Sequence, residues 1–318
     1  MKKWRRPLLG LAILFVAGAA RLPFEMAFTA DLQQRGLLSA PLELGLKEKI
    51  GQNSTAVALA GLQTLVATFT NLQMTDAFTY QQWDKVEGHA ETTSTLAPRT
   101  TYYWDMGAWH QAYNASSYYR TDSGLPPLLA RLESQRWIAK GREFYERGIR
   151  NNPDDWQLYS MLGALLSDPN RAPDPAAAEE AYAKAIATGK APVSLERFRL
   201  YAAARAGKDP ARTLAEIEDL LAKSGNRSPS LLSLRYSLEY QLDEPDDPLA
   251  LALSIFGSEE KALRNLGTFY TDVLKQWPTS GVEAAVRLLE KRKGISPEDE
   301  RSFIRQREVA LEMHGLAR

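Results

Sequence analysis

The stretch GREFYERGIRNNPDDWQLYSMLGALL, residues 141–166, carries the pattern that decides the fold. Gly141, Tyr145 and Gly148 follow one another at spacings of four and three residues. Residues at these spacings share one face of a helix, so the two glycines leave hollows in which a neighbouring helix can lie close. Pro153 then ends the helix, because a proline ring clashes with the preceding turn. The stretch therefore predicts two helices joined by a turn near Pro153.

The same pattern recurs downstream. Ala178, Tyr182 and Ala185 repeat the spacing of four and three residues. Elsewhere apolar residues recur at helical spacing, Pro or Gly interrupts them about every 15 to 20 residues, and no alternating strand pattern is present. We therefore predict an all-α chain built from pairs of helices. In the first helix of each pair, a short pattern that starts with a large residue begins near residues 104, 159, 198, 231 and 263.

This pattern resembles the tetratricopeptide repeat (TPR) family, which has a period of about 34 residues. The family's large-x2-Leu-Gly-x2-large motif is matched by Tyr159, Leu162-Gly163 and Leu166. The resemblance covers roughly residues 98–290 and implies a solenoid of antiparallel helix hairpins behind an N-terminal hydrophobic segment. The whole arrangement is similar to uncharacterised membrane-tethered TPR proteins of bacteria. An irregular helical bundle is the alternative.

The N-terminus begins MKKWRR and continues with an uncharged run over residues 7–20. This order is typical of an export signal. The run spans roughly 21 Å as a helix, which is short of the ~30 Å hydrocarbon core and favours cleavage. Further apolar residues at 22–28 favour an anchor instead. We predict a signal peptide or membrane anchor over residues 1–30. The bulk of the chain would then lie in the periplasm or be secreted, and a core helix of a cytosolic protein is the alternative.

A second uncharged segment covers residues 52–75. Its Gln, Thr and Asn side chains are costly in lipid, so a buried helix is favoured over a second membrane span. We predict a helical N-terminal region over residues 31–97, the repeats over 98–290, and a C-terminal helix or cap over 291–318.

Composition excludes several classes of protein. The chain has 39 Lys+Arg and 39 Asp+Glu residues, so it carries no global charge to attract nucleic acid. It has no cysteine, which excludes disulfides and thiolate metal sites. Its three histidines are not in a metal-binding spacing, and no nucleotide-binding or hydrolase motif is present. We predict a protein that is not an enzyme, with no catalytic residue, no metal and no cofactor.

Aromatic residues are concentrated between residues 80 and 119. Most aromatic residues at helical spacing pack in a core, and that is the alternative here. The TPR register implies that some of them line the concave groove, where they would anchor a protein or peptide partner. Arginines in the groove would hold a carboxylate or phosphate, although solvated surface charges are the alternative. The implied groove residues are Tyr102, Asp105, Trp109, Tyr113, Arg199, Tyr236 and Arg264.

The sequence thus predicts a non-catalytic TPR-like adaptor or scaffold at the bacterial envelope, tethered to the membrane through its N-terminal segment. A structural subunit of a larger membrane complex is the first alternative. A glycan-processing enzyme that uses Asp105 is a more distant one, and it would require paired carboxylates about 5 to 10 Å apart.

Overall fold

The computed structural model describes residues 18–31, 49–223, 226–274 and 276–313, and this part of the chain contains helices and no strands. The prediction of an all-α chain is confirmed. Two compact units are present, residues 1–65 and 66–318, and the division falls inside helix α2 (Lys49–Thr79). The predicted boundaries after residues 30, 97 and 290 stay predictions.

The first unit contains a helix over residues 18–31 and the first part of α2. Residues 1–17, which hold most of the predicted signal or anchor, lie outside the described residues. Phe24, Met26 and Phe28 are exposed on the helix that follows. Among the described helices, none combines the length and the apolar character that a membrane span requires.

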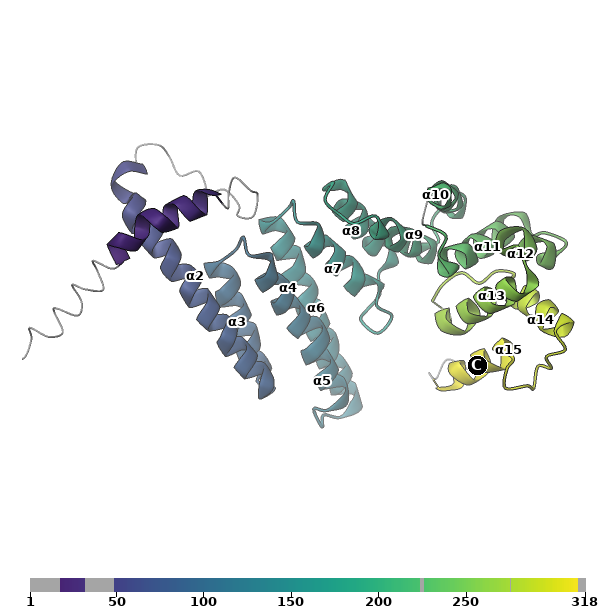
Figure 1. Ribbon diagram of the computed structural model, residues 1–318. Coiled ribbons are helices and arrows are strands. Elements are labelled where there is room, and N and C mark those ends of the chain that lie inside the picture. Colours follow the sequence, from purple (N-terminus) through teal and green to yellow (C-terminus); the bar gives the residue numbers. More distant parts are fainter. Residues whose placement is uncertain (1–17, 32–48, 224–225, 275, 314–318) are drawn as a thin grey trace, which may run out of the picture. The chain divides into compact units, whose positions relative to one another are not determined.

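The second unit begins within α2, and its helices follow one another in chain order (Figure 1). Helices that are neighbours in the sequence pack together, most extensively α7 with α8 and α8 with α9. Two further contacts join helices that are not adjacent in the chain, α4 with α7 and α11 with α13. The helices are α3 (Trp83–Leu96), α4 (Thr101–Trp109), the π-helix η1 (His110–Ala115), α5 (Ser116–Thr121), α6 (Pro127–Asn151), α7 (Trp156–Ser167), α8 (Pro175–Ala187), α9 (Ser194–Ala206), α10 (Pro210–Ala222), α11 (Pro229–Asp243), α12 (Pro248–Phe256), α13 (Glu259–Val273), α14 (Val282–Arg292) and α15 (Phe303–Met313).

Several of these helices begin at an aspartate followed by a proline. The carboxylates of Asp174, Asp209 and Asp247 accept hydrogen bonds from backbone N–H groups of the first turns of α8, α10 and α12. Proline is favoured at the first helical position, because the N–H that it lacks would have no helical partner there. At these three prolines the interruption of the helical pattern is therefore a helix start with a capping side chain.

The hollows predicted at the glycines are present. A Cβ atom added at Gly148 would lie 2.8 Å from the Cβ of Trp104, and one at Gly163 would lie 2.8 Å from the ring of Tyr182. These distances are too short for any larger residue, so each glycine admits a large side chain of another helix. The glycine pattern thus reports close contacts between helices.

The core of the second unit consists of three successive hydrophobic clusters. The first extends from α2 to α9, the next joins α9, α10 and α11, and the last extends from α11 to α15. Leu221 and Trp277 pack against both of the last two clusters. Each helix therefore buries its apolar face mainly against its neighbours along the chain.

The part of helix α2 that belongs to the second unit is buried on one side only. In the second unit its buried residues are Ala67, Thr70, Met74 and Ala77, while Val66, Phe69 and Leu72 are exposed. The first of the three hydrophobic clusters covers one face of this part of the helix. Among the residues that the structure describes, none covers the large side chains of the other face, which are in contact with solvent. The prediction of a buried helix over residues 52–75 therefore holds for one face of this part of α2.

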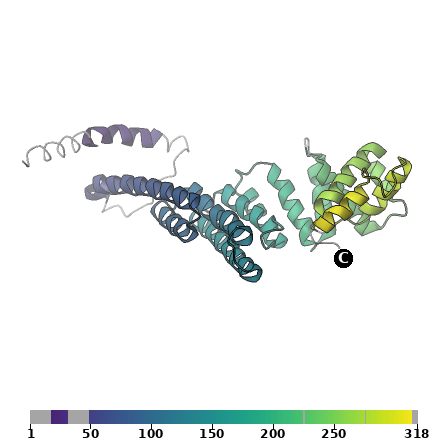
Figure 2. The same ribbon diagram turned by 90° about the horizontal axis from the view of Figure 1, so that it is seen from below.

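The C-terminal helix α15 packs against α13 and α14 (Figure 2). The buried Arg307 guanidinium donates hydrogen bonds to the carbonyl oxygens of Tyr270 and Leu274 at the end of α13. The buried Glu290 carboxylate accepts from the Ser302 hydroxyl at 3.0 Å and from the Phe303 N–H at 2.6 Å. A positive charge at a helix C-terminus and a negative charge at a helix N-terminus are both stabilising, so these contacts hold α15 in place.

Candidate functional site

The predicted aromatic residues lie on a helix with an irregular centre. α4, η1 and α5 run without a break from residue 101 to residue 121, and the middle segment η1 has π-helical hydrogen bonding. Such segments are rare and frequently lie at functional sites. The ring of Trp109, the last residue of α4, stacks on the ring of Tyr113 in η1, with centroids 4.2 Å apart and planes inclined by 19°. Nothing in the sequence pattern indicated the π-helical segment.

The exposed aromatic residues of this helix differ from those of its core. Trp109 is 43% exposed and Tyr102 is 53% exposed, whereas Tyr113 is half-buried. Trp104 is buried, and its ring packs against Phe144 at a centroid distance of 5.0 Å. The core interpretation therefore holds for Trp104, whereas Tyr102 and Trp109 are exposed and their place in a groove stays a prediction.

Asp105 lies about one helical turn before Trp109 on α4 and is tied to α6. Its carboxylate accepts a hydrogen bond of 2.8 Å from the hydroxyl of Tyr145, whose side chain is fully buried. Burial raises the pKa of Asp105 above its usual value, and the hydrogen bond from Tyr145 offsets part of this shift. Burial, followed by the nearby carboxylate, raises the pKa of Tyr145 as well, so its hydroxyl remains a donor. The bond holds α4 against α6.

Arg171, in the loop between α7 and α8, supports the ring of Tyr113. The buried guanidinium lies 5.0 Å from the ring centroid and donates to the hydroxyls of Ser116 and Ser117. Asp168 lies 3.7 Å from the same guanidinium. We call Asp105, Trp109, Tyr113 and Arg171 the Trp109 face. Arg171 carries no signal in the sequence, since a loop residue has no periodicity that would single it out.

Arg199 is already paired within the chain. Its guanidinium lies 2.6 Å from the carboxylate of Glu216 and 3.7 Å from that of Glu179. Arg212 binds the same two carboxylates. The charge predicted to hold a partner's carboxylate or phosphate is therefore neutralised by neighbouring helices.

The predicted position of Tyr236 is wrong. Its side chain is fully buried, and its hydroxyl donates to the carbonyl oxygens of Pro248 and Gly281 at 3.2 Å each. The register implied for α11 therefore does not hold at this residue, because a shift of one residue rotates a side chain by about 100°. Arg264 is exposed on α13 and borders a hollow of about 260 Å³. Arg199, Tyr236 and Arg264 make their contacts on α9, α11 and α13, outside the Trp109 face.

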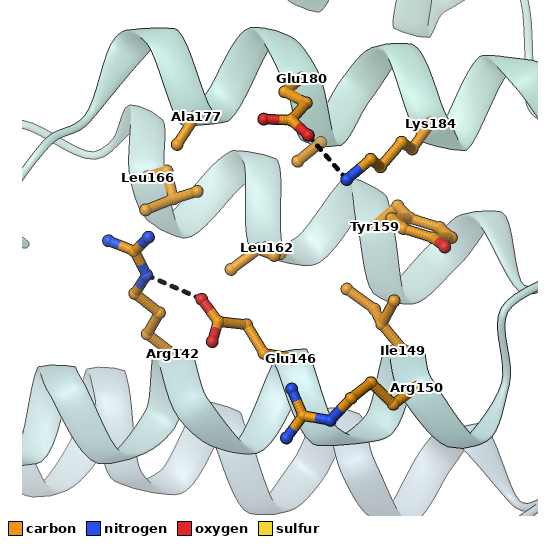
Figure 3. A pocket seen from close by; sticks show the side chains of 11 residues that line it. Arg142, Glu146, Ile149, Arg150, Tyr159, Leu162, Leu166, Ala177, Glu180 and Lys184 are labelled. Atoms are coloured by element: carbon orange, nitrogen blue, oxygen red, sulfur yellow. Dashed lines mark hydrogen bonds and ion pairs between the residues drawn. The ribbon is translucent and has the colours of Figure 1, made fainter.

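A pocket of about 300 Å³ lies between α6, α7 and α8 (Figure 3). Its apolar lining includes Leu162, Leu166 and Ala181, which are all buried. Charged residues of α6 and α8 stand on both sides of this lining (Figure 3). No sequence pattern marked this pocket as a site: Tyr159, Leu162 and Leu166 belong to the motif over residues 159–166, and the other lining residues come from two further helices.

His110 is buried inside the helix that carries the Trp109 face. Its Nδ1 atom lies 3.0 Å from the side-chain nitrogen of Asn114, and its ring lies 4.6 Å from that of Phe78. Burial lowers the pKa of His110 below its ordinary value of 6.5. Within the described residues, no group of three potential metal ligands is present.

We expect His110 to make the protein less stable in weak acid. Below about pH 6.5 the unfolded chain binds a proton at this histidine that the folded chain does not, so the free energy of unfolding falls as the pH falls. Urea unfolding from about pH 7.5 down to about pH 5.5 should show a smaller loss in His110→Gln than in the wild type. An unchanged loss in the variant would show that the histidine titrates alike in both states.

No family model matches this sequence, and no curated protein matches it.

Proposed function

We propose that this protein is a non-catalytic adaptor or scaffold that binds a protein or peptide partner at the Trp109 face. The observation that carries the proposal is the partly exposed Trp109 ring, stacked on Tyr113 at 4.2 Å and held from the protein side. Tryptophan and tyrosine are enriched among the residues that dominate binding energy at interfaces, since they bury a large area at a small cost in entropy.

The surroundings of the stack support this role. The Arg171 guanidinium holds the Tyr113 ring in place, and the Asp105 carboxylate, one helical turn before Trp109, is fixed by the hydroxyl of Tyr145. An aromatic anchor that is already ordered loses little conformational freedom when a partner binds. A fixed polar group next to it gives the partner's backbone an acceptor, which favours a peptide over a purely apolar ligand.

We further propose that the helices form TPR-like repeats. The close contacts at Gly148 and Gly163 and the packing of helices along the chain support this interpretation. In such stacks each repeat buries its apolar face against its neighbours and leaves one surface free for a partner. We also propose that the N-terminal segment tethers the protein to the inner membrane with its bulk in the periplasm, or is cleaved to secrete it. N-terminal sequencing of the mature protein distinguishes the two.

Trp109→Ala is expected to weaken capture of the partner by about 30-fold or more, because an anchor residue typically contributes 2 kcal/mol or more. The free energy of unfolding of the variant, measured with urea, should stay within about 0.5 kcal/mol of the wild-type value, since the ring is partly exposed. Pull-down from solubilised membranes, with quantitative mass spectrometry, measures the capture. Tyr80→Ala is the matched control, because Tyr80 is an exposed aromatic residue outside this face. Equal capture by Trp109→Ala and the control would contradict the proposal.

A structural subunit of a larger complex is the second candidate, and the exposed side chains of α2 favour it. Val66, Phe69 and Leu72 present large apolar groups to solvent, and such surfaces commonly mark contacts with another protein. If this candidate is correct, Phe69→Ser should release the protein from its complex whereas Trp109→Ala should not. Size-exclusion chromatography of the solubilised complex separates the two outcomes.

A further inference from the structure

We infer that the pocket between α6, α7 and α8 is a second binding site, for a peptide segment that presents a large apolar side chain next to a carboxylate. Its volume of about 300 Å³ is at the lower end of the range for ligand pockets. A pocket of this size suits one or two side chains better than a cofactor. The site shares no lining residue with the Trp109 face, so the inference does not rest on the proposed function.

The lining of the pocket favours an apolar group. Leu162, Leu166 and the buried Ala181 line it, and Ile149 and Tyr159 also face it (Figure 3). These side chains come from three helices of one hydrophobic cluster, and that cluster holds them in place. An apolar side chain that enters would remove its own surface and theirs from water, which is favourable at about 25 cal/mol per Å².

The charged residues around the pocket are matched except for one. The Arg142 guanidinium lies 3.0 Å from the Glu146 carboxylate on α6, and the Lys184 ammonium lies 2.7 Å from the Glu180 carboxylate on α8 (Figure 3). The side chain of Arg150 also lines the pocket (Figure 3). This side chain makes no ion pair or hydrogen bond to any residue that the structure describes. Three cations and two carboxylates therefore surround the apolar lining, and the unmatched cation is a guanidinium.

The unmatched guanidinium selects the ligand's charge. An arginine binds a carboxylate through two parallel hydrogen bonds, and Arg150 is exposed, so its pairing requires little desolvation. Glu146 and Glu180 already form ion pairs with Arg142 and Lys184, so a basic ligand would have to displace one of these two side chains. The arrangement thus favours an acidic residue adjacent to Leu, Ile, Met or Phe.

A phage-displayed library of random heptapeptides, selected on the intact protein, is the probe. The expected result is enrichment of peptides in which a large apolar residue neighbours Asp or Glu. A synthetic copy of the most enriched peptide, followed by fluorescence anisotropy, should bind Arg150→Gln about tenfold more weakly than the wild type, because one charge-assisted contact is lost. Arg131→Gln, on the same helix but outside the pocket, should bind like the wild type.

A second variant tests the apolar part of the site. Ala177 lines the pocket and is only half-buried, so Ala177→Phe should fill the pocket from its edge and abolish peptide binding while the circular dichroism spectrum stays unchanged. Trp109→Ala should leave binding of the same peptide intact, which keeps this test separate from that of the Trp109 face. The inference is overturned if no apolar–acidic pair is enriched, or if the enriched peptide binds Arg150→Gln and Ala177→Phe as it binds the wild type.

Discussion

Gly141→Ala is expected to destabilise the protein by about 3 kcal/mol, since overpacking a well-ordered core typically costs 1–3 kcal/mol and sometimes more. A Cβ atom at this position would lie 2.7 Å from the backbone nitrogen of Ala112 and 2.8 Å from the carbonyl oxygen of Ala108. Backbone atoms inside a helix cannot move aside as the end of a flexible side chain can. Helix α6 would therefore have to separate from α4 and η1, and the contacts behind the Trp109 face would loosen.

Urea unfolding followed by far-ultraviolet circular dichroism measures this loss. Gly88→Ala in α3 is the matched control, because Gly88 is also inside a helix but a Cβ atom there meets nothing within 4 Å. The control should be stabilised by about 0.5–1 kcal/mol, since alanine favours the helix over glycine. If both variants were equally stable, α6 would not approach η1 as closely as the structure indicates.

Arg171→Met is expected to cost about 2–3 kcal/mol, because hydrogen bonds to a charged group contribute about 1.5–3 kcal/mol. Methionine fills a similar volume but donates nothing to Ser116 and Ser117, and it places no positive charge against the ring of Tyr113. The loop between α7 and α8 would lose its attachment to α5. The Trp109 face would become less ordered, and partner capture should weaken although Trp109 itself is unchanged.

Hydrogen exchange provides a direct measurement of this change. Amides of residues 168–174 should exchange faster in Arg171→Met, while those of α13 should keep the wild-type rate. Arg171→Lys should restore only part of the stability, because an ammonium lacks the planar fork that reaches both serines. Arg131→Met is the control, since Arg131 is exposed and has no described partner. Unchanged exchange in the loop of Arg171→Met would contradict this role.

Some features of the fold follow from local chemistry and could be predicted. The helix starts at Asp174, Asp209 and Asp247 need only a capping carboxylate and a proline, and both are adjacent in the sequence. The hollows at Gly148 and Gly163 are visible because a glycine inside a helical pattern requires a packing reason. Trp109 is partly exposed, and its place in a groove stays a prediction.

Other features depend on which helices meet, and the sequence does not contain that information in a local form. The amino-acid sequence by itself determined an all-helical chain, its breaks, and the glycines at which helices approach, because periodicity and capping act within a few residues. Only the tertiary structure decided that Tyr236 is buried, that Arg171 supports the ring of Tyr113, and that Arg150 lacks a partner. Burial and pairing are properties of side chains contributed by distant helices, so the Trp109 face and the pocket between α6, α7 and α8 were visible only once those helices were packed.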